Sequence, residues 1–263
     1  LALAYFNKKD EEVKAIECME RAFLLDVTDA RVLMELDQLY KRVHRSHAER
    51  LAFLQKYPEL IAQRDDLVLE EITLLNQIGE YEKAKTLLDE HIFHPWEGGE
   101  GKVPGQYQFA RVELAKKALE AGNYSEAVSL LAECLEYPHH LGEGKLHGAQ
   151  ENDFYYFMGC AYEGLGQNDK AVECWEQAIV GPTEPAAAMY YNDAKPDKIF
   201  YQGLALLKLN RMDEANGRFH KLTTYGEKHL FDKVKMDYFA VSLPDLLIWE
   251  DDLTIRNVIH CKY

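Results

Sequence analysis

The chain has 263 residues, of which 47% are hydrophobic, so it carries enough apolar material for a folded core. Its net charge of −15 argues against nucleic acid and anionic membrane surfaces as partners, because both require clustered lysine and arginine. No stretch approaches the roughly 18 consecutive apolar residues of a membrane-spanning helix. We therefore expect neither a nucleic-acid nor a membrane partner, and we read the acidity as a means of keeping an elongated surface soluble.

Helical hairpins are expected along the whole chain. Residues 1–6 resemble the end of a helix that pairs with residues 11–25, and residues 30–40 pair with residues 46–57. Four further pairs are expected within residues 65–92, 106–135, 152–179 and 196–230. After Tyr225 the repeat fades, and two terminal helices are expected over residues 228–240 and 252–263.

Four turn sequences mark the tips of these hairpins. They begin at Gly79, Gly122, Gly166 and Asn210, and their alanines, Ala84, Ala127, Ala171 and Ala215, step by 43, 44 and 44 residues. A fixed period of this order is typical of stacked repeats that cannot bury their apolar faces alone. Each glycine stands where a helix must end, the usual place for a left-handed residue. Asn123 followed by Glu126 predicts a capping box.

In two units a small residue is followed 12 residues later by alanine and 16 residues later by an aromatic residue, at Gly159, Ala171 and Trp175 and at Gly203, Ala215 and Phe219. Small residues let two antiparallel helices cross closely, and aromatic residues fill the gap between units. The chain thereby resembles the tetratricopeptide repeat, most specifically at Gly159, Tyr162, Ala171, Trp175 and Ala178. The resemblance implies an all-α fold: a right-handed α-solenoid of about six hairpins with C-terminal capping helices.

We predict a single solenoid over residues 1–263, with a partial unit at 1–29, units at 30–64, 65–104, 105–150, 151–195 and 196–230, and terminal helices at 231–263. Because the chain opens on Leu1, inside a helical pattern, we expect it to be a piece of a larger protein, and its compartment stays undetermined. Cys134, Cys160 and Cys174 fall at apolar helix positions and are expected to act as small core residues. Unpaired cysteines favour a reducing compartment such as the cytoplasm.

Each of three units is longer than the roughly 34 residues of a bare tetratricopeptide unit. The extra residues follow the second helix each time, at residues 94–104, 138–150 and 181–196. Equivalent insertions in successive units are expected to stack on one edge of the solenoid, where repeat proteins commonly place a binding surface. We therefore predict that the three insertions form one shared rim.

The first two insertions also share a sequence. Gly-Glu-Gly-Lys at residues 99–102 recurs at residues 142–145, and Pro95 recurs as Pro138. We expect the two copies to follow similar backbone paths with a polar concavity between them. The repeat has two readings that stay open here: a structural turn inherited by duplication, or a shared part of a binding surface.

The residues around these copies suit a polyhydroxylated ligand. Aromatic faces stack on sugar rings, while carboxylates and imidazoles meet hydroxyl groups. The candidate ligand-binding residues are His94, Trp96, Glu97, Glu100, His139, His140, Glu143, Tyr190 and Asp193. A single loop tryptophan such as Trp96 is also a common packing plug, so the sequence leaves both roles open.

Neither a metal nor a cofactor is expected. The histidines of the insertions match no structural zinc spacing, and the cysteines lie on helices away from them. Neighbouring helices pack about 8–10 Å apart, so carboxylates at equivalent positions of successive insertions are expected at a comparable separation. That range overlaps the separation of about 6.5–9.5 Å between the two catalytic carboxylates of inverting glycosidases. Spacing alone is a weak warrant, so no residue is assigned as catalytic and the question of an enzyme stays open.

A narrower resemblance rests on the insertions together with residues 201–205 and 237–244. These are similar to the C-terminal helical half of large bacterial proteins in which a galactose-mutarotase-like β-domain precedes the repeats. That resemblance implies a carbohydrate context, with the present chain as the repeat half alone. It carries no catalytic residue over to this sequence.

Two hypotheses about function follow. The first is a non-catalytic interaction scaffold that binds a protein domain or peptide through its concave face and insertion edge, with the β-domain of the same parent chain as one such partner. The alternative is the helical half of a bacterial carbohydrate-active enzyme whose sugar-binding or glycosidase site is completed by carboxylates and aromatic residues of the insertions.

Overall fold

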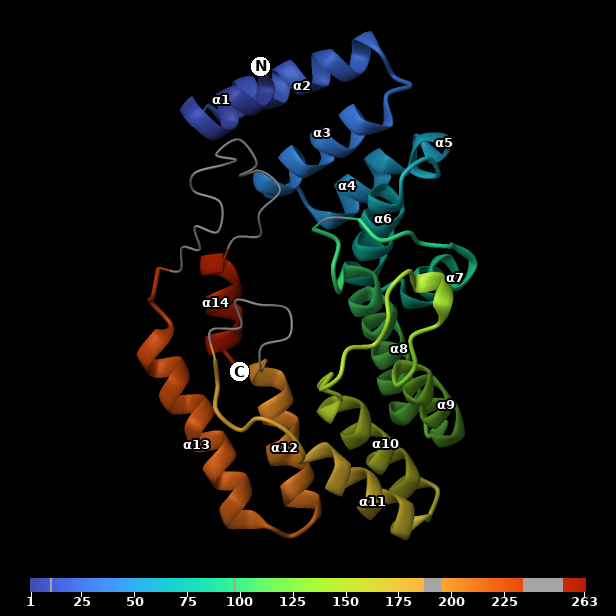
Figure 1. Ribbon diagram of the computed structural model, residues 1–263, viewed down its shortest axis with the longest axis vertical. Helices are drawn as coiled ribbons and strands as arrows, with labels where there is room; N and C mark the ends of the chain where they lie inside the picture. The colour runs from blue at the N-terminus through green and yellow to red at the C-terminus, as the bar shows by residue number, and fades with distance from the viewer. Residues whose placement is uncertain (10, 97, 187–194, 234–252) are drawn as a thin grey trace. The chain divides into compact units, whose positions relative to one another are not determined.

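A computed structural model of the protein describes residues 1–9, 11–96, 98–186, 195–233 and 253–263. These residues form α-helices and one 3-10 turn and contain no strand, which confirms the predicted all-α class (Figure 1). The elements are α1 Ala2–Lys9, α2 Glu12–Leu25, α3 Ala30–Arg42, α4 His47–Leu54, α5 Pro58–Ile61, α6 Asp65–Gln77, α7 Tyr81–Glu90, α8 Lys102–Glu120, α9 Tyr124–Cys134, η1 His139–Leu141, α10 Asn152–Gly164, α11 Asn168–Ala178, α12 Pro196–Lys208, α13 Met212–His229 and α14 Leu253–Cys261.

The described residues divide into two compact units. Unit 1 holds residues 1–106 and unit 2 holds residues 107–233 and 253–263, so the division falls inside α8. Successive helices pack as hairpins: in unit 1, α1 contacts α2, α3 contacts α4 and α6 contacts α7; in unit 2, α10 contacts α11 and α12 contacts α13. Arg111 of α8 forms an ion pair with Glu133 of α9 (2.7 Å), which joins the remaining pair. The hairpins therefore match the prediction, while the hand of the solenoid stays a prediction.

The hairpin tips share one backbone device. At each tip a residue with positive φ stands two positions after the last residue of the first helix, and the N–H of the residue after it donates to the carbonyl five residues earlier. The positive-φ residues are Gly79, Gly122, Gly166 and Asn210, as expected, together with His44 at the α3–α4 tip, which the sequence did not reveal. The predicted capping box at Asn123 is wrong, because its side chain makes no cap hydrogen bond; the capping box lies at Ser46 and Glu49.

The small-to-aromatic pattern predicted for two units is confirmed by close packing. A Cβ placed on Gly159 would lie 2.3 Å from Trp175 Nε1, and one on Gly203 would lie 2.4 Å from a ring carbon of Phe219. Glycine is therefore the residue that lets each ring lie directly against the first helix of its hairpin. Ala171 and Ala215 are fully buried beside these contacts.

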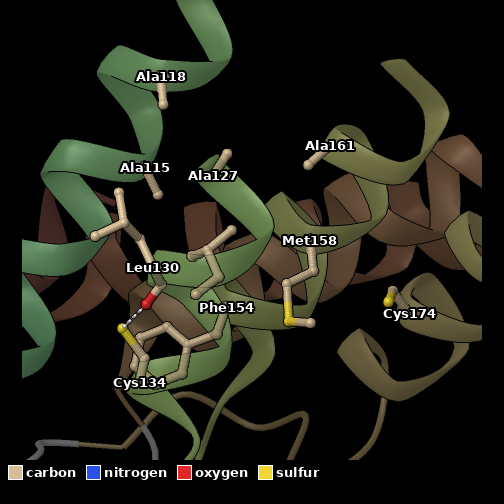
Figure 2. Close-up of a cluster of buried hydrophobic side chains, with 10 residues drawn as sticks. Ala115, Ala118, Ala127, Leu130, Cys134, Phe154, Met158, Ala161 and Cys174 are labelled. Carbon is tan, nitrogen blue, oxygen red and sulfur yellow. Dashed lines mark hydrogen bonds between the residues drawn. The ribbon is translucent and has the colours of Figure 1, made fainter. Parts of the chain in front are cut away.

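Small residues also dominate the core between α8, α9 and α10 (Figure 2). Ala115, Ala127 and Ala161 are fully buried there, around the larger side chains of Phe154 and Met158. Cys134 and Cys174 are buried and unpaired, as predicted, whereas Cys160 is half-buried. Burial raises the pKa of the Cys134 thiol to about 12, and this thiol lies 3.4 Å from the Leu130 carbonyl oxygen.

The core of unit 1 contains an ion cluster instead. The Arg50 side chain of α4, only 3% exposed, donates from Nε (3.1 Å) and Nη2 (2.5 Å) to Asp37 of α3 and from Nη2 to Glu70 of α6 (2.5 Å). Two carboxyls share one guanidinium in a site where Asp37 has no exposed surface. Burial raises the pKa of Asp37 to about 6, since one cation compensates two anions incompletely.

The chain departs from the predicted helix boundaries at three places. The short helix α5 was not predicted, and α8 begins at Lys102, four residues earlier than expected. Helix α13 runs unbroken to His229, so the predicted start of a new helix at Lys228 is wrong. Helix α14 confirms the second terminal helix, and residues 234–252 lie outside the described part of the chain. None of the described helices combines the length and apolarity needed to cross a membrane.

Candidate functional site: the insertions and the first-helix face

The first insertion is held at its start by Asp65, in the first turn of α6. His91 Nε2 lies 2.7 Å from Asp65 Oδ1, the backbone N–H of His94 donates to Oδ2 (2.8 Å), and His94 Nδ1 lies 3.0 Å from Oδ2. Although burial by itself raises the pKa of Asp65, the hydrogen bonds from the two histidines lower it overall. His94, a candidate ligand residue, is therefore engaged with Asp65, while its side chain remains 79% exposed.

Trp96 folds back on its own turn. A Cβ placed on Gly99 would lie 2.4–2.7 Å from three atoms of the indole, and the N–H of Gly99 donates to the Trp96 carbonyl (3.0 Å). The indole is half-buried, so one face of it is committed to Gly99. This arrangement favours the packing role that the sequence left open. Glu100 is exposed, and Glu97 lies outside the described residues.

The second insertion opens with the 3-10 turn His139–Leu141, which ends on Gly142 with φ 73. His139 is exposed, and His140 is half-buried, with a buried Nε2. Glu143 is half-buried. Lys145 closes the insertion, because its Nζ donates to the Leu135 carbonyl (2.8 Å) and lies 2.5 Å from Glu151 Oε1.

The two Gly-Glu-Gly-Lys copies follow different backbone paths, which overturns the expected similarity. In the first copy the second glycine, Gly101, has positive φ (74), and Lys102 is already the first residue of α8. In the second copy the first glycine, Gly142, has positive φ, and Lys145 stands seven residues before α10. The physical reason is that α8 begins earlier relative to its insertion than α10 does.

The third insertion is described only at its flanks. Tyr190 and Asp193, two of the candidate ligand residues, lie outside the described residues. At the first flank, the Gln202 amide donates to the Pro182 carbonyl (2.9 Å), and Lys221 forms an ion pair with Glu184. The first insertion belongs to unit 1 and the second to unit 2, so the shared rim stays a prediction.

A polar contact that sequence reasoning missed fixes the start of every insertion. Asp65, Gln108 and Asn152 stand 43 and 44 residues apart, and each is bonded to the residue 26 positions later. Gln108 Nε2 donates to the Cys134 carbonyl (3.2 Å) and Asn152 Nδ2 to the Ala178 carbonyl (2.8 Å). We call these contacts the braces. The signal was present as polar residues at the repeat period, but their chemistry differs from unit to unit.

The first helices of unit 2 gather aromatic side chains. The rings of Tyr156, Phe157 and Tyr201 lie 5.2–5.6 Å from one another, although the first two are on α10 and the third is on α12. All three are half-buried. Phe157 and Tyr201 stand 44 residues apart, and Glu113 of α8 precedes Phe157 by the same step. The repeat therefore places these three side chains at equivalent positions on successive first helices.

Charged pairs accompany the rings. Lys198 forms an ion pair with Asp153 in which each side chain is 12% exposed, and its Nζ lies 4.8 Å from the centroid of the Phe154 ring. On α8, Lys116 lies 2.7 Å from Glu113. We define the first-helix face as Glu113, Lys116, Asp153, Tyr156, Phe157, Lys198 and Tyr201. Burial, followed by the negative charge of Asp153, raises the pKa of Tyr201.

Groups of three or more His, Cys, Asp or Glu side chains able to hold a metal ion are absent from the described residues. What the first-helix face offers instead is apolar ring surface with paired charges of both signs. Such a surface suits association, because aromatic residues are enriched at protein interfaces and partly exposed rings retain area to bury.

Comparison with known proteins agrees with the repeat. Residues 153–179, which span α10 and α11, match the family model of the tetratricopeptide repeat. One similar solved structure is the ArsTM double mutant of MamA RS-1, with 19% identity and a TM-score of 0.41; the match covers 73% of this chain and 91% of that chain. Another is MamA 41-end from Desulfovibrio magneticus RS-1, with 18% identity and a TM-score of 0.41; the match covers 73% of this chain and 92% of that chain. A further structure of MamA shows 18% identity and a TM-score of 0.33 over 84% and 91%. The residues that match the tetratricopeptide model are therefore those of the α10–α11 hairpin.

Proposed function

We propose that the chain is a protein-interaction scaffold whose first-helix face in unit 2 binds an extended segment of a partner protein. The observation that carries this proposal is the ring cluster of Tyr156, Phe157 and Tyr201, which lies on first helices and keeps part of its surface exposed. Burying the remaining ring area against a partner is the largest apolar gain available on this face.

The repeat supports a linear partner. Equivalent positions on successive first helices are displaced only by the step from one repeat to the next, so Glu113, Phe157 and Tyr201 recur along one direction. A chain laid along that direction meets one such side chain per repeat. The more exposed ion pair of Glu113 with Lys116 supplies both an acceptor and a donor for the backbone groups of an extended segment.

The carbohydrate alternative draws less support. Its aromatic candidate in the first insertion, Trp96, has one face against Gly99, and the candidates Glu97, Tyr190 and Asp193 lie outside the described residues. A galactose-mutarotase-like β-domain of the same parent chain remains one protein partner that the scaffold hypothesis allows.

A peptide selection tests the proposal. A phage-displayed library of random peptides is panned on the wild-type chain, and the enriched peptides are titrated against the double variant Phe157→Ala, Tyr201→Ala. We expect at least a tenfold loss of affinity, because ring residues at an interface carry a disproportionate share of the binding energy. Phe231→Ala is the matched control, since this aromatic residue of unit 2 is 89% exposed, and its loss should change the affinity by less than about twofold.

Circular dichroism of the double variant must first show unchanged helicity, so that lost binding is not lost folding. Peptides that bind the wild type and the double variant equally well would refute the first-helix face as the site.

A further inference from the structure

The segment after α14 lies beside the first-helix face although it belongs to another element. Helix α14 is fixed on α13, because Asn257, 3% exposed, donates from Nδ2 to the His229 carbonyl (2.8 Å). The Cys261 carbonyl also lies against Gly226, where an added Cβ would stand 2.5 Å from the carbonyl oxygen. These two contacts aim the residues that follow, Lys262 and Tyr263, toward α12.

Tyr263 contacts Phe200, which stands next to Tyr201 of the ring cluster on α12. Its ring centroid lies 6.3 Å from that of Phe200, which in turn lies 5.6 Å from that of Tyr201. Apart from burial, the charges that most affect the pKa of Tyr263 come from Asp197, Lys116 and Lys198. Two of these residues belong to the first-helix face, so the phenol lies in the electrostatic environment of that face.

Tyr263 is more exposed than the rings of the cluster. It is 53% exposed, whereas Tyr156, Phe157 and Tyr201 are half-buried within their own helices. It enters from outside the hairpins, and within the described part of the chain its ring packs against that of Phe200. An aromatic side chain in this position covers part of the face and can leave it without disturbing a hairpin core.

We infer that Tyr263 is a resident occupant of the first-helix face and that the partner segment presents an aromatic side chain that takes its place. This inference rests on the proposed function and adds the chemistry of the partner. The surroundings of Tyr263 combine carboxylates with lysines, so they impose no single sign of charge on the incoming residue. The face is therefore expected to favour an aromatic ring in the partner segment, as the position of Tyr263 illustrates.

Two peptide libraries of equal size, one with a fixed central tyrosine and one with a fixed central leucine, test the inference. Both are panned on the wild-type chain, and the enriched peptides are titrated against Tyr263→Ala, Tyr263→Phe and Tyr201→Ala. We expect binders from the tyrosine library, at least a fivefold gain in affinity for Tyr263→Ala, and wild-type affinity for Tyr263→Phe, which keeps the ring. Tyr201→Ala should bind at least tenfold more weakly.

Ile259→Ala is the matched control on α14, because Ile259 is 53% exposed and is expected to leave the affinity unchanged. Unchanged or weaker binding by Tyr263→Ala, or equal enrichment from the leucine library, overturns the inference about Tyr263. If Tyr201→Ala still loses peptide affinity in that case, the proposed function stands. Peptides that bind Tyr201→Ala as tightly as the wild type overturn both the inference about Tyr263 and the proposed function.

Discussion

The hairpins α3–α4 and α10–α11 close with the same left-handed turn, yet opposite chemistry holds their helices together. In α10–α11 a glycine lets the Trp175 ring lie against the facing helix, and the contact is apolar and close. In α3–α4 the guanidinium of Arg50 is buried against Asp37 and reaches Glu70 of the next hairpin. The comparison shows that the backbone geometry of the repeat tolerates very different cores. The tetratricopeptide model matches at α10–α11, where the contact is apolar.

The largest effect is expected from breaking the ion cluster. Arg50→Met leaves two buried carboxyls without their cation, and we expect the free energy of unfolding to fall by about 3–5 kcal/mol, measured by urea denaturation followed by circular dichroism. Lys83→Met is the control, because its pair with Glu80 is exposed and its loss should cost less than about 1 kcal/mol. Equal losses in the two variants would mean that the cluster does not hold α3 to α4.

A smaller effect tests the apolar hairpin. Gly159→Ala places a Cβ 2.3 Å from Trp175 Nε1, so the ring or the helix must shift, and we expect a loss of about 1–3 kcal/mol in unfolding free energy. The matched control is Gly217→Ala in α13, where an added Cβ meets nothing within 4 Å, and there we expect a gain of up to about 1 kcal/mol. If both glycines accept alanine equally, the Gly159–Trp175 contact does not constrain the hairpin.

The smallest effect concerns the turn that the two hairpins share. His44 holds φ 59 at an exposed tip, a conformation that costs an ordinary residue more than it costs glycine. His44→Gly should therefore raise the free energy of unfolding by about 0.5–1 kcal/mol and, with it, the melting temperature. Gly122→Ala at the α8–α9 tip should lower the free energy of unfolding by a similar amount. A melting temperature that moves the same way in both variants would contradict a shared left-handed turn.

The sequence was sufficient for the hairpins because their signals are local and periodic. The turn glycines and the pairs of Gly159 with Trp175 and Gly203 with Phe219 are set by helix geometry, and their spacing is visible without a structure. The Arg50 cluster was invisible for the opposite reason. Its members come from three helices, and a charged residue on a helix is ordinarily read as solvent-exposed.

The site was harder to predict than the fold. Repetition of Gly-Glu-Gly-Lys suggested equal paths, but a loop path depends on where the next helix begins, which the repeat does not fix. Half-buried rings such as Tyr156 and Tyr201 follow the same helical periodicity as core residues. The sequence pattern alone therefore could not distinguish the first-helix face from the core. Trp96 showed the reverse, since this aromatic residue of a loop packs against Gly99, only three residues further along the chain.

The braces at Asp65, Gln108 and Asn152 separate the direction of an insertion from its length. Each one fixes the departure point of the loop to the first helix of the same hairpin, so residues added or removed further along change how far the loop reaches but not where it sets out. Such a chain can exchange one loop for another between repeats without retuning the helices beneath. The insertions can therefore vary in sequence and length from repeat to repeat while the helical hairpins that carry them stay unchanged.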